Sequence, residues 1–259
     1  MKMRGIFRLT CSFFGFVLLS VNALPQPAAA VERIDTMGLI VLYPHYGSVE
    51  LVCGSRPSRS DRSVLVMAEA AYTRVKPLRR KFSHANIHGV HVSRGRRHEG
   101  TPFERKTGAF VWYDGQYRFL QLSTYDTTTQ QVTRLPDYGR RCRVFDTAAA
   151  HKGMGFMQEL IVHQGRIMPT VRKDGEMHQY RALCSHKGRL CIIESDTVVA
   201  FAGFKRMLHA FGVSEALYLD MGSGWNYAWY RDGENIVELN PEAYYSRFCT
   251  NWIVFRRRK

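Results

Sequence analysis

The chain has 259 residues, 45% of them hydrophobic, and a formal net charge of +15 at neutral pH. This length suits one domain with a sizeable core or two small ones; no linker, repeat or low-complexity stretch divides it, so we expect a single domain over residues 31–259. The basic excess favours polyanionic partners such as phosphate-bearing sugars, anionic polymers or lipid surfaces. No nucleic-acid motif is present, and we expect no nucleic-acid partner.

Residues 1–30 have the layout of a secretory signal peptide. Lys2, Arg4 and Arg8 precede an apolar run, Leu9 to Leu24, and small residues end the segment at Ala28 to Ala30. An uncleaved anchor is the alternative, but the apolar run is shorter than the roughly 20 residues that a membrane span needs. We therefore expect export to a periplasm or beyond, with membrane contact only through this segment.

The next segment alternates strand patterns with polar loops. Gly38 to Tyr43 and Val49 to Cys53 read as strands, and a loop with three arginines and three serines follows at 54–62. Arg56 in this loop could bind phosphate through its guanidinium group; an ordinary exposed connection is the alternative. Ser63 to Met67 is a further strand, and Glu69 stands among small residues immediately after it.

Residues 76–107 are basic and loop-rich. The histidines His84, His88 and His91 could line a polar pocket or lie scattered on the surface. Zinc is disfavoured, because the chain has no CxxC pair and the His84-to-His88 spacing has no cysteine near it in the sequence. We predict no metal site.

Three hairpins are predicted in the middle of the chain. Their turns fall at Asp114-Gly115, at 163–166 and at Lys187-Gly188, while Ser123 to Tyr138 reads as a long loop or a helix. The third turn would set Cys184 opposite Cys191. A disulfide and two buried free thiols remain alternatives there.

The last third combines one helix with more strands. Phe201 to Phe211 has apolar residues at helical spacing and ends before Gly212. A strand at 216–219, a hairpin at 229–239 and a strand at Thr250 to Phe255 follow. The expected fold class is α+β: a mixed, largely antiparallel sheet built of hairpins, with one or two packed helices.

Asp220 follows the strand at 216–219 and precedes a loop in which Gly222 and Gly224 flank Ser223. A strand that ends in a glycine-containing turn can present a carboxylate at a cleft, although such an acid can also merely cap the turn. Glu69 repeats this arrangement at another strand end.

The order of motifs resembles the phosphodiester glycosidase family, which contains the enzyme that removes N-acetylglucosamine from a sugar-phosphate diester. The motifs are GAFVWYDG, GFMQELIVHQG, RALCSHKGRLCIIES, AFAGFKRMLHAFGV, ALYLDMGSG and TNWIVF. The resemblance begins at about Val64 and implies a divergent, exported bacterial hydrolase. Its substrates would be glycosyl phosphodiester or related glycosidic bonds.

The family's DGGGS motif corresponds to 220–224. Asp220 and Gly222 match it, Met221 and Ser223 replace glycines, and Gly224 stands at the serine position. The altered motif keeps open a second hypothesis, a non-catalytic envelope glycan-binding protein with the same fold.

Other positions of the family are matched in part. Glu69 stands where the family's Asn-Gly-Gly-Phe-Phe segment has its asparagine, whereas Arg181, Glu194 and Asn251 resemble residues of the family's strands. The resemblance implies convergence of these side chains on one cleft.

The roles implied are a catalytic pair and a set of substrate ligands. Asp220 would be the catalytic carboxylate and Glu69 its partner acid, and the substrate would be held by Arg181, Arg56, Glu194, Ser223, Asn226 and Asn251. The cofactor is left open, because paired acids can also hold Mg²⁺ or Ca²⁺.

Overall fold

Antiparallel strands are the main secondary structure of the computed structural model, which describes residues 30–73, 82–102, 107–221 and 226–258. These described residues are 48% strand and 13% helical, and they form five sheets. The expected α+β class is therefore wrong, and the fold is closer to all-β. The reason is that residues 91–98 and 123–134, which carry no strong hairpin signal, also form strand pairs.

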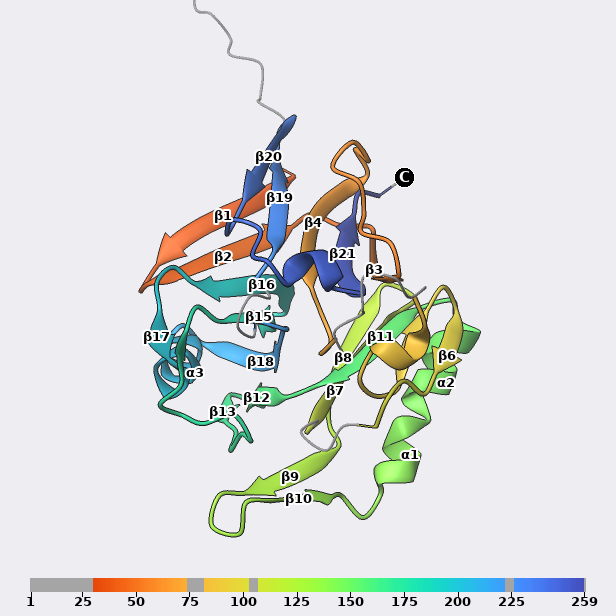
Figure 1. Cartoon of the computed structure of the whole chain (residues 1–259), viewed down its shortest axis with the longest axis vertical. Helices are drawn as coiled ribbons and strands as arrows, with labels where there is room; N and C mark the ends of the chain where they lie inside the picture. The colour runs from red at the N-terminus through yellow and green to blue at the C-terminus, as the bar shows by residue number, and fades with distance from the viewer. Residues whose placement is uncertain (1–29, 74–81, 103–106, 222–225, 259) are drawn as a thin grey trace, which may run out of the picture.

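The largest sheet has seven strands (Figure 1). Helix α3 (Phe201–Ala210) packs on it through Phe201, Phe204 and Leu208, as its helical spacing predicts. The strands lie in the order β1 (Val31–Thr36), β2 (Leu39–Pro44), β16 (Arg189–Ser195), β15 (Arg181–His186), β18 (Val213–Tyr218), β12 (Leu160–His163) and β13 (Arg166–Ile167).

A second sheet has five strands with β4 at its centre, and every residue of β4 is buried. Strand β21 pairs with both β4 and β3, so the last strand of the chain joins two of the first. The order is β20 (Asn235–Glu238), β19 (Ala228–Asp232), β4 (Val64–Glu69), β21 (Asn251–Arg256) and β3 (Ser48–Cys53).

The third sheet also has five strands: β6 (Arg96–His98), β5 (His91–Ser93), β11 (Met154–Gln158), β7 (Gly108–Tyr113) and β8 (Gln116–Gln121). Helix α2 (Val144–Ala150) covers it through Phe145 and Ala148, and the preceding helix α1 (Tyr138–Cys142) adds Cys142 to the same apolar cluster. The small elements are β9 (Ser123–Asp126), β10 (Gln131–Arg134), β14 (Met177–His178), β17 (Val199–Ala200) and the 3₁₀ turns η1 (His84–Asn86) and η2 (Ser246–Phe248).

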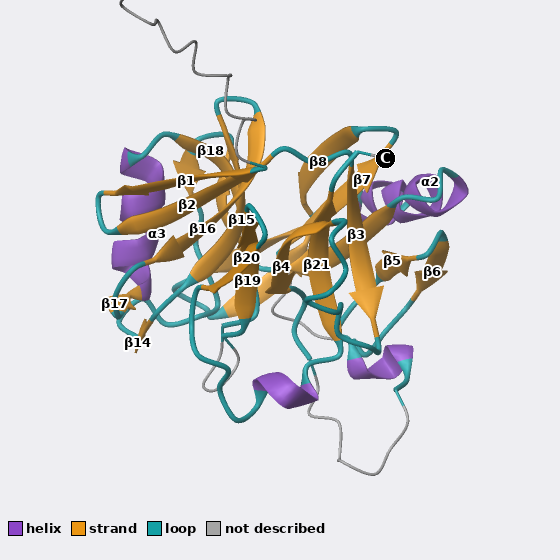
Figure 2. Ribbon diagram, turned by 90° about the horizontal axis from the view of Figure 1, so that it is seen from above, coloured by secondary structure: helices purple, strands orange, loops and turns teal. Residues whose placement is uncertain are grey.

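The three large sheets share one apolar core. Leu42 and Leu183 from the first sheet pack in the same cluster as Leu65 from the second and Phe110 and Phe156 from the third. In Figure 2 the strands fill the middle of the molecule, while α3 and α2 lie on opposite outer sides. Because the sheets converge on this core, ends of strands that are distant in sequence meet.

The predicted hairpins and the helix at 201–211 are confirmed. The turns at Asp114-Gly115 and Lys187-Gly188 have positive φ at both positions, the conformation that two-residue hairpins require. Cys184 lies opposite Cys191 as predicted, and both thiols are free, so the free-thiol alternative holds.

The predicted signal peptide lies outside the described residues except for Ala30. Within the described part of the chain, the helices are too short or too polar to cross a membrane.

Candidate active site

The two acids predicted as a catalytic pair lie at strand ends that meet. Asp220, just beyond β18, donates its backbone N–H to the carbonyl of Ala70, just beyond β4, at 2.9 Å. The N–H of Thr73 in turn donates to Asp220 Oδ2 at 3.3 Å. Glu69 ends β4 and is fully buried, and Asp220 is only 4% exposed. The fold thus brings two carboxylates into one buried polar region.

Burial dominates the electrostatics of Glu69. It raises the pKa of this carboxyl to about 8, and the nearby Ser246 hydroxyl lowers the pKa in part. The charge of Asp220 raises the pKa further, and those of Arg181 and Arg56 oppose it. Within the described residues neither Glu69 oxygen has a well-formed hydrogen bond. Glu69 is therefore protonated at neutral pH.

Arg181 and Glu194 face each other across the β15–β16 hairpin and are both buried. The Arg181 guanidinium donates to Glu194 Oε2 from Nε at 2.7 Å and to the carbonyl of Asn226 from Nη2 at 2.9 Å. Asn240 donates to the other Glu194 oxygen. Burial raises the pKa of Glu194, and the Arg181 charge and these hydrogen bonds lower it. Glu194 therefore orients Arg181 and is not available as a substrate ligand.

One group of Arg181 remains for a ligand. Its Nη1 is buried and has no hydrogen-bond partner among residues that the structure describes. A buried guanidinium nitrogen without a partner is energetically costly unless something binds it. Arg181 is thus the predicted substrate ligand that the geometry supports best.

Asn251 uses all of its side-chain atoms to hold the segment after β4. Its Oδ1 accepts the Ala71 N–H at 2.7 Å, and its Nδ2 donates to the Ala71 carbonyl at 2.9 Å and to Thr73 Oγ1 at 3.0 Å. Thr73 is the residue whose N–H reaches Asp220. Asn251 therefore holds the segment 71–73 that contacts Asp220. Both of its polar side-chain atoms are used in these bonds, which does not agree with the predicted role as a substrate ligand.

Arg56 and Asn226 lie beside Glu69 and pack against the segment at 242–246. Arg56 donates to Glu242 at 2.5 Å and to the Ser246 carbonyl at 3.0 Å, and its guanidinium lies 4.5 Å from the Tyr227 ring centroid. The N–H of Asn226 donates to Ser246 Oγ at 3.2 Å. Both side chains support the site, and Arg56 adds positive charge near Glu69. The predicted ligand Ser223 lies outside the described residues.

An aromatic and cationic group near Asp220 was not predicted from the sequence. The Arg172 guanidinium lies 4.7 Å from the ring centroid of Tyr218, and its Nη2 donates to the Tyr72 hydroxyl at 3.4 Å. Burial raises the pKa of both tyrosines, and the Asp220 charge raises them further. A signal existed: Tyr218 and Asp220 are two residues apart at a strand end and so share one face.

Cys249 is a buried thiol close to the same acids. Burial raises its pKa well above the ordinary value, and the charges of Glu69 and Asp220 raise it further. The thiol is therefore protonated at neutral pH, and it is a neutral, weakly polar neighbour of the two acids.

No family model matches the sequence, and no curated protein matches it. Among solved structures, the fold is similar to the zebrafish N-acetylglucosamine-1-phosphodiester alpha-N-acetylglucosaminidase catalytic domain auto-inhibited by its pro-peptide. The TM-score is 0.54 at 11% sequence identity, and the similarity covers 89% of this chain and 82% of the other. At this identity the similarity shows that the two chains share a fold, because one fold can serve many different activities.

Proposed function

We propose that the protein hydrolyses glycosyl phosphodiester or related glycosidic bonds, with Asp220 and Glu69 as its catalytic pair. The observation that carries this proposal is the pairing of two buried carboxyl groups, one of which has a pKa of about 8. Enzymes that cleave glycosidic bonds commonly use two carboxyl groups whose environments separate their protonation states. The similarity of fold to a phosphodiester glycosidase catalytic domain supports the same reaction class.

The two acids would divide the proton transfers. Glu69, protonated at neutral pH, would give its proton to the oxygen that leaves the anomeric carbon. Asp220, whose Oδ2 accepts the Thr73 N–H, would act as base or nucleophile. As a base it would take one proton from water while the hydroxide joins the sugar. The products are then a free sugar and a phosphate monoester.

Arg181 would hold the phosphate or the charge that develops on the leaving oxygen. Its Nη1 has no described partner, and Glu194 keeps the guanidinium fixed, so the site needs little reorganisation when charge appears. The signal peptide predicted for residues 1–30 would bring this activity to the outside of the cytoplasm, which N-terminal sequencing of the exported protein would test.

The direct test is a substrate screen over sugar-phosphate diesters and bacterial glycans, followed by Asp220→Asn and Glu69→Gln on the best substrate. Each substitution should lower turnover about 10²–10⁴-fold, the range for general acid–base groups. Glu215→Gln is a matched control, because Glu215 pairs with His163 on the surface side of β18. Unchanged turnover in the Asp220→Asn variant would refute the assignment.

The same screen separates turnover from binding. If the wild-type protein binds a glycan that it never hydrolyses, the non-catalytic glycan-binding hypothesis replaces this proposal. Repeating the assay with and without a chelator tests whether a divalent cation at the acids takes part.

A further inference from the structure

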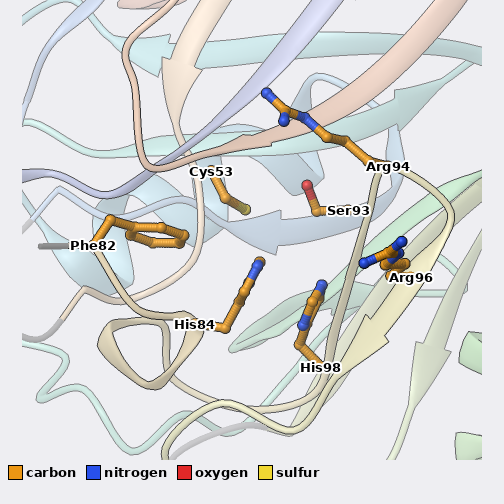
Figure 3. Close-up of a pocket in the computed structure, with 7 residues that line it drawn as sticks. All are labelled: Cys53, Phe82, His84, Ser93, Arg94, Arg96 and His98. Atoms are coloured by element: carbon orange, nitrogen blue, oxygen red, sulfur yellow. The ribbon is translucent and has the colours of Figure 1, made fainter.

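A cysteine and two histidines from three segments converge at a second place in the fold. Cys53 ends β3, His84 lies in η1, and His91 begins β5. One potential ligand atom from each of the three lies within 4.8 Å of the others. Cys53 and His84 line a cavity of about 520 Å³, shown in Figure 3, in which Cys53 and Phe82 lie near His84 and the His98 ring stands beside it. The sequence predicted no metal site here, because Cys53 is distant from the histidines along the chain.

The hydrogen bonds of His91 indicate where its lone pair points. Its Nδ1 lies 3.0 Å from the Gly89 carbonyl oxygen, which can only accept, so Nδ1 carries the proton. Its Nε2 therefore presents a lone pair to His84 Nδ1 at 2.9 Å, and His84 supplies the proton between them. A metal cation that replaced this proton would find two imidazole nitrogens already facing each other. A histidine ligand whose other nitrogen is bonded to a carbonyl is also the usual arrangement around protein-bound metals.

The ligand set selects the kind of cation. One thiolate and two neutral imidazoles suit Zn²⁺ and similar borderline metals, whereas Ca²⁺ and Mg²⁺ prefer oxygen ligands. The fourth tetrahedral position would face the cavity, where His98 is stacked on His84 with the ring centroids 3.3 Å apart. Arg94 and Arg96 also line the cavity. Their charge disfavours a cation, and the negative thiolate of Cys53 offsets this.

We propose that Cys53, His84 and His91 bind one Zn²⁺ ion. On binding, the Cys53 thiol releases its proton to solvent, and neutral His84 changes tautomer: its proton moves from Nδ1 to Nε2 through solvent, which leaves the Nδ1 lone pair for the ion. The ion would join β3 of one sheet to β5 of another and to η1.

The site is a structural brace next to the acid pair. Cys53 lies opposite Asn251 in the β3–β21 register, and Ile87, which follows η1, bridges to Thr73. Asn251 and Thr73 are the two residues that hold the segment beside Asp220. Metal binding should therefore stabilise the support of the acid pair without touching the acids.

The test uses the full chain, reduced and stripped of metal, titrated with Co²⁺ as a spectroscopic probe and then with Zn²⁺ in competition. We expect one equivalent of Co²⁺, an ultraviolet thiolate-to-cobalt charge-transfer band that Zn²⁺ abolishes, and no effect of Mg²⁺. Zn²⁺ should also raise Tm. Cys53→Ser should remove the band, and Cys53→Ser and His84→Ala should each weaken affinity by at least about 100-fold, beyond the usual effect of outer-shell changes.

Cys142→Ser and His209→Ala are matched controls, because a buried cysteine and an exposed helical histidine are changed away from the cluster. Both should bind like the wild type. The absence of stoichiometric Co²⁺ binding, or a band that survives in folded Cys53→Ser protein, would overturn the proposal. Circular dichroism checks folding. Cys53 and His84 lie in different elements, so the cobalt affinity of whichever variant folds tests the proposal. If neither variant folds, the Co²⁺ stoichiometry and the thiolate band of the wild-type protein test it.

Discussion

Two pairs of buried charged residues lie close together in this protein and are built in opposite ways. Arg181 and Glu194 have opposite charges, and both Glu194 oxygens accept hydrogen bonds. Glu69 and Asp220 are both acids that would repel each other if both were ionised, and the Glu69 oxygens have no well-formed hydrogen bond within the described part of the chain. The first pair is arranged to hold its geometry. The second keeps an unfavourable arrangement that stability alone would not select, which is typical of a functional site.

The largest expected effect on stability comes from breaking the opposite-charge pair. Glu194→Ala should lower the free energy of unfolding by about 3–5 kcal/mol, because it leaves Arg181 buried without its counter-charge. Urea denaturation of the two proteins measures this. A loss below about 1 kcal/mol, the size for exposed pairs, would mean that water replaces Glu194 and that the pair is not a fixed support.

Glu69→Gln should change how stability depends on pH. The folded pKa of Glu69, about 8, lies above its ordinary value of 4.5, so between these values the folded protein holds a proton that the unfolded chain releases. Wild-type stability should therefore fall as pH rises, by up to about 1.4 kcal/mol per pH unit from this group. The variant should match the wild type near pH 5 and exceed it near pH 8. If the free energies of unfolding of the variant and the wild type change with pH in parallel, the pKa of Glu69 is not raised.

Asn251→Ala should loosen the support behind the acid pair. It removes three hydrogen bonds to Ala71 and Thr73 and leaves buried groups unpaired, which should cost about 1–3 kcal/mol. Amide hydrogen exchange measures this: relative to the wild type, the variant should exchange the Ala71 amide faster and the amides of β16 at nearly the same rate. Equal exchange at both places would show that Asn251 does not hold this segment.

The smallest effect is expected at the surface. Arg256 donates hydrogen bonds to Glu50 and Asp61, and the bond to Asp61, together with those from Ser63, lowers the pKa of Asp61 to about 2. This stabilisation is present above the ordinary pKa of 3.8 and is lost as pH falls towards 2. Because the groups are partly exposed, Arg256→Ala should cost less than about 1 kcal/mol, and less still at high salt. A loss of stability as large as that of Glu194→Ala would show that this partly exposed ion pair supports the fold as strongly as the buried pair of Arg181 and Glu194.

Local patterns predicted the parts of the fold that depend on neighbouring residues. The turn at Lys187-Gly188 needs positive φ, and the helix at Phe201 needs an apolar face, so both could be identified without tertiary information. The pair β5–β6 was missed because it is short and its basic sequence, Arg96–His98, has no apolar alternation. These residues form strands because β5 pairs with β11, the central strand of the sheet, and β6 pairs with β5.

The sequence by itself determined that Glu69 and Asp220 stand at the ends of buried strands, because strand length and the small residues beyond each strand are local properties. Only the tertiary structure decided what surrounds them. Packing of three sheets on one core brought the acids together, enclosed Glu69 so that its pKa rises, and committed Glu194 and Asn251 to support. The same packing joined Cys53 to His84 and His91. Burial and partner choice depend on residues far apart in the chain, and no local pattern encodes them.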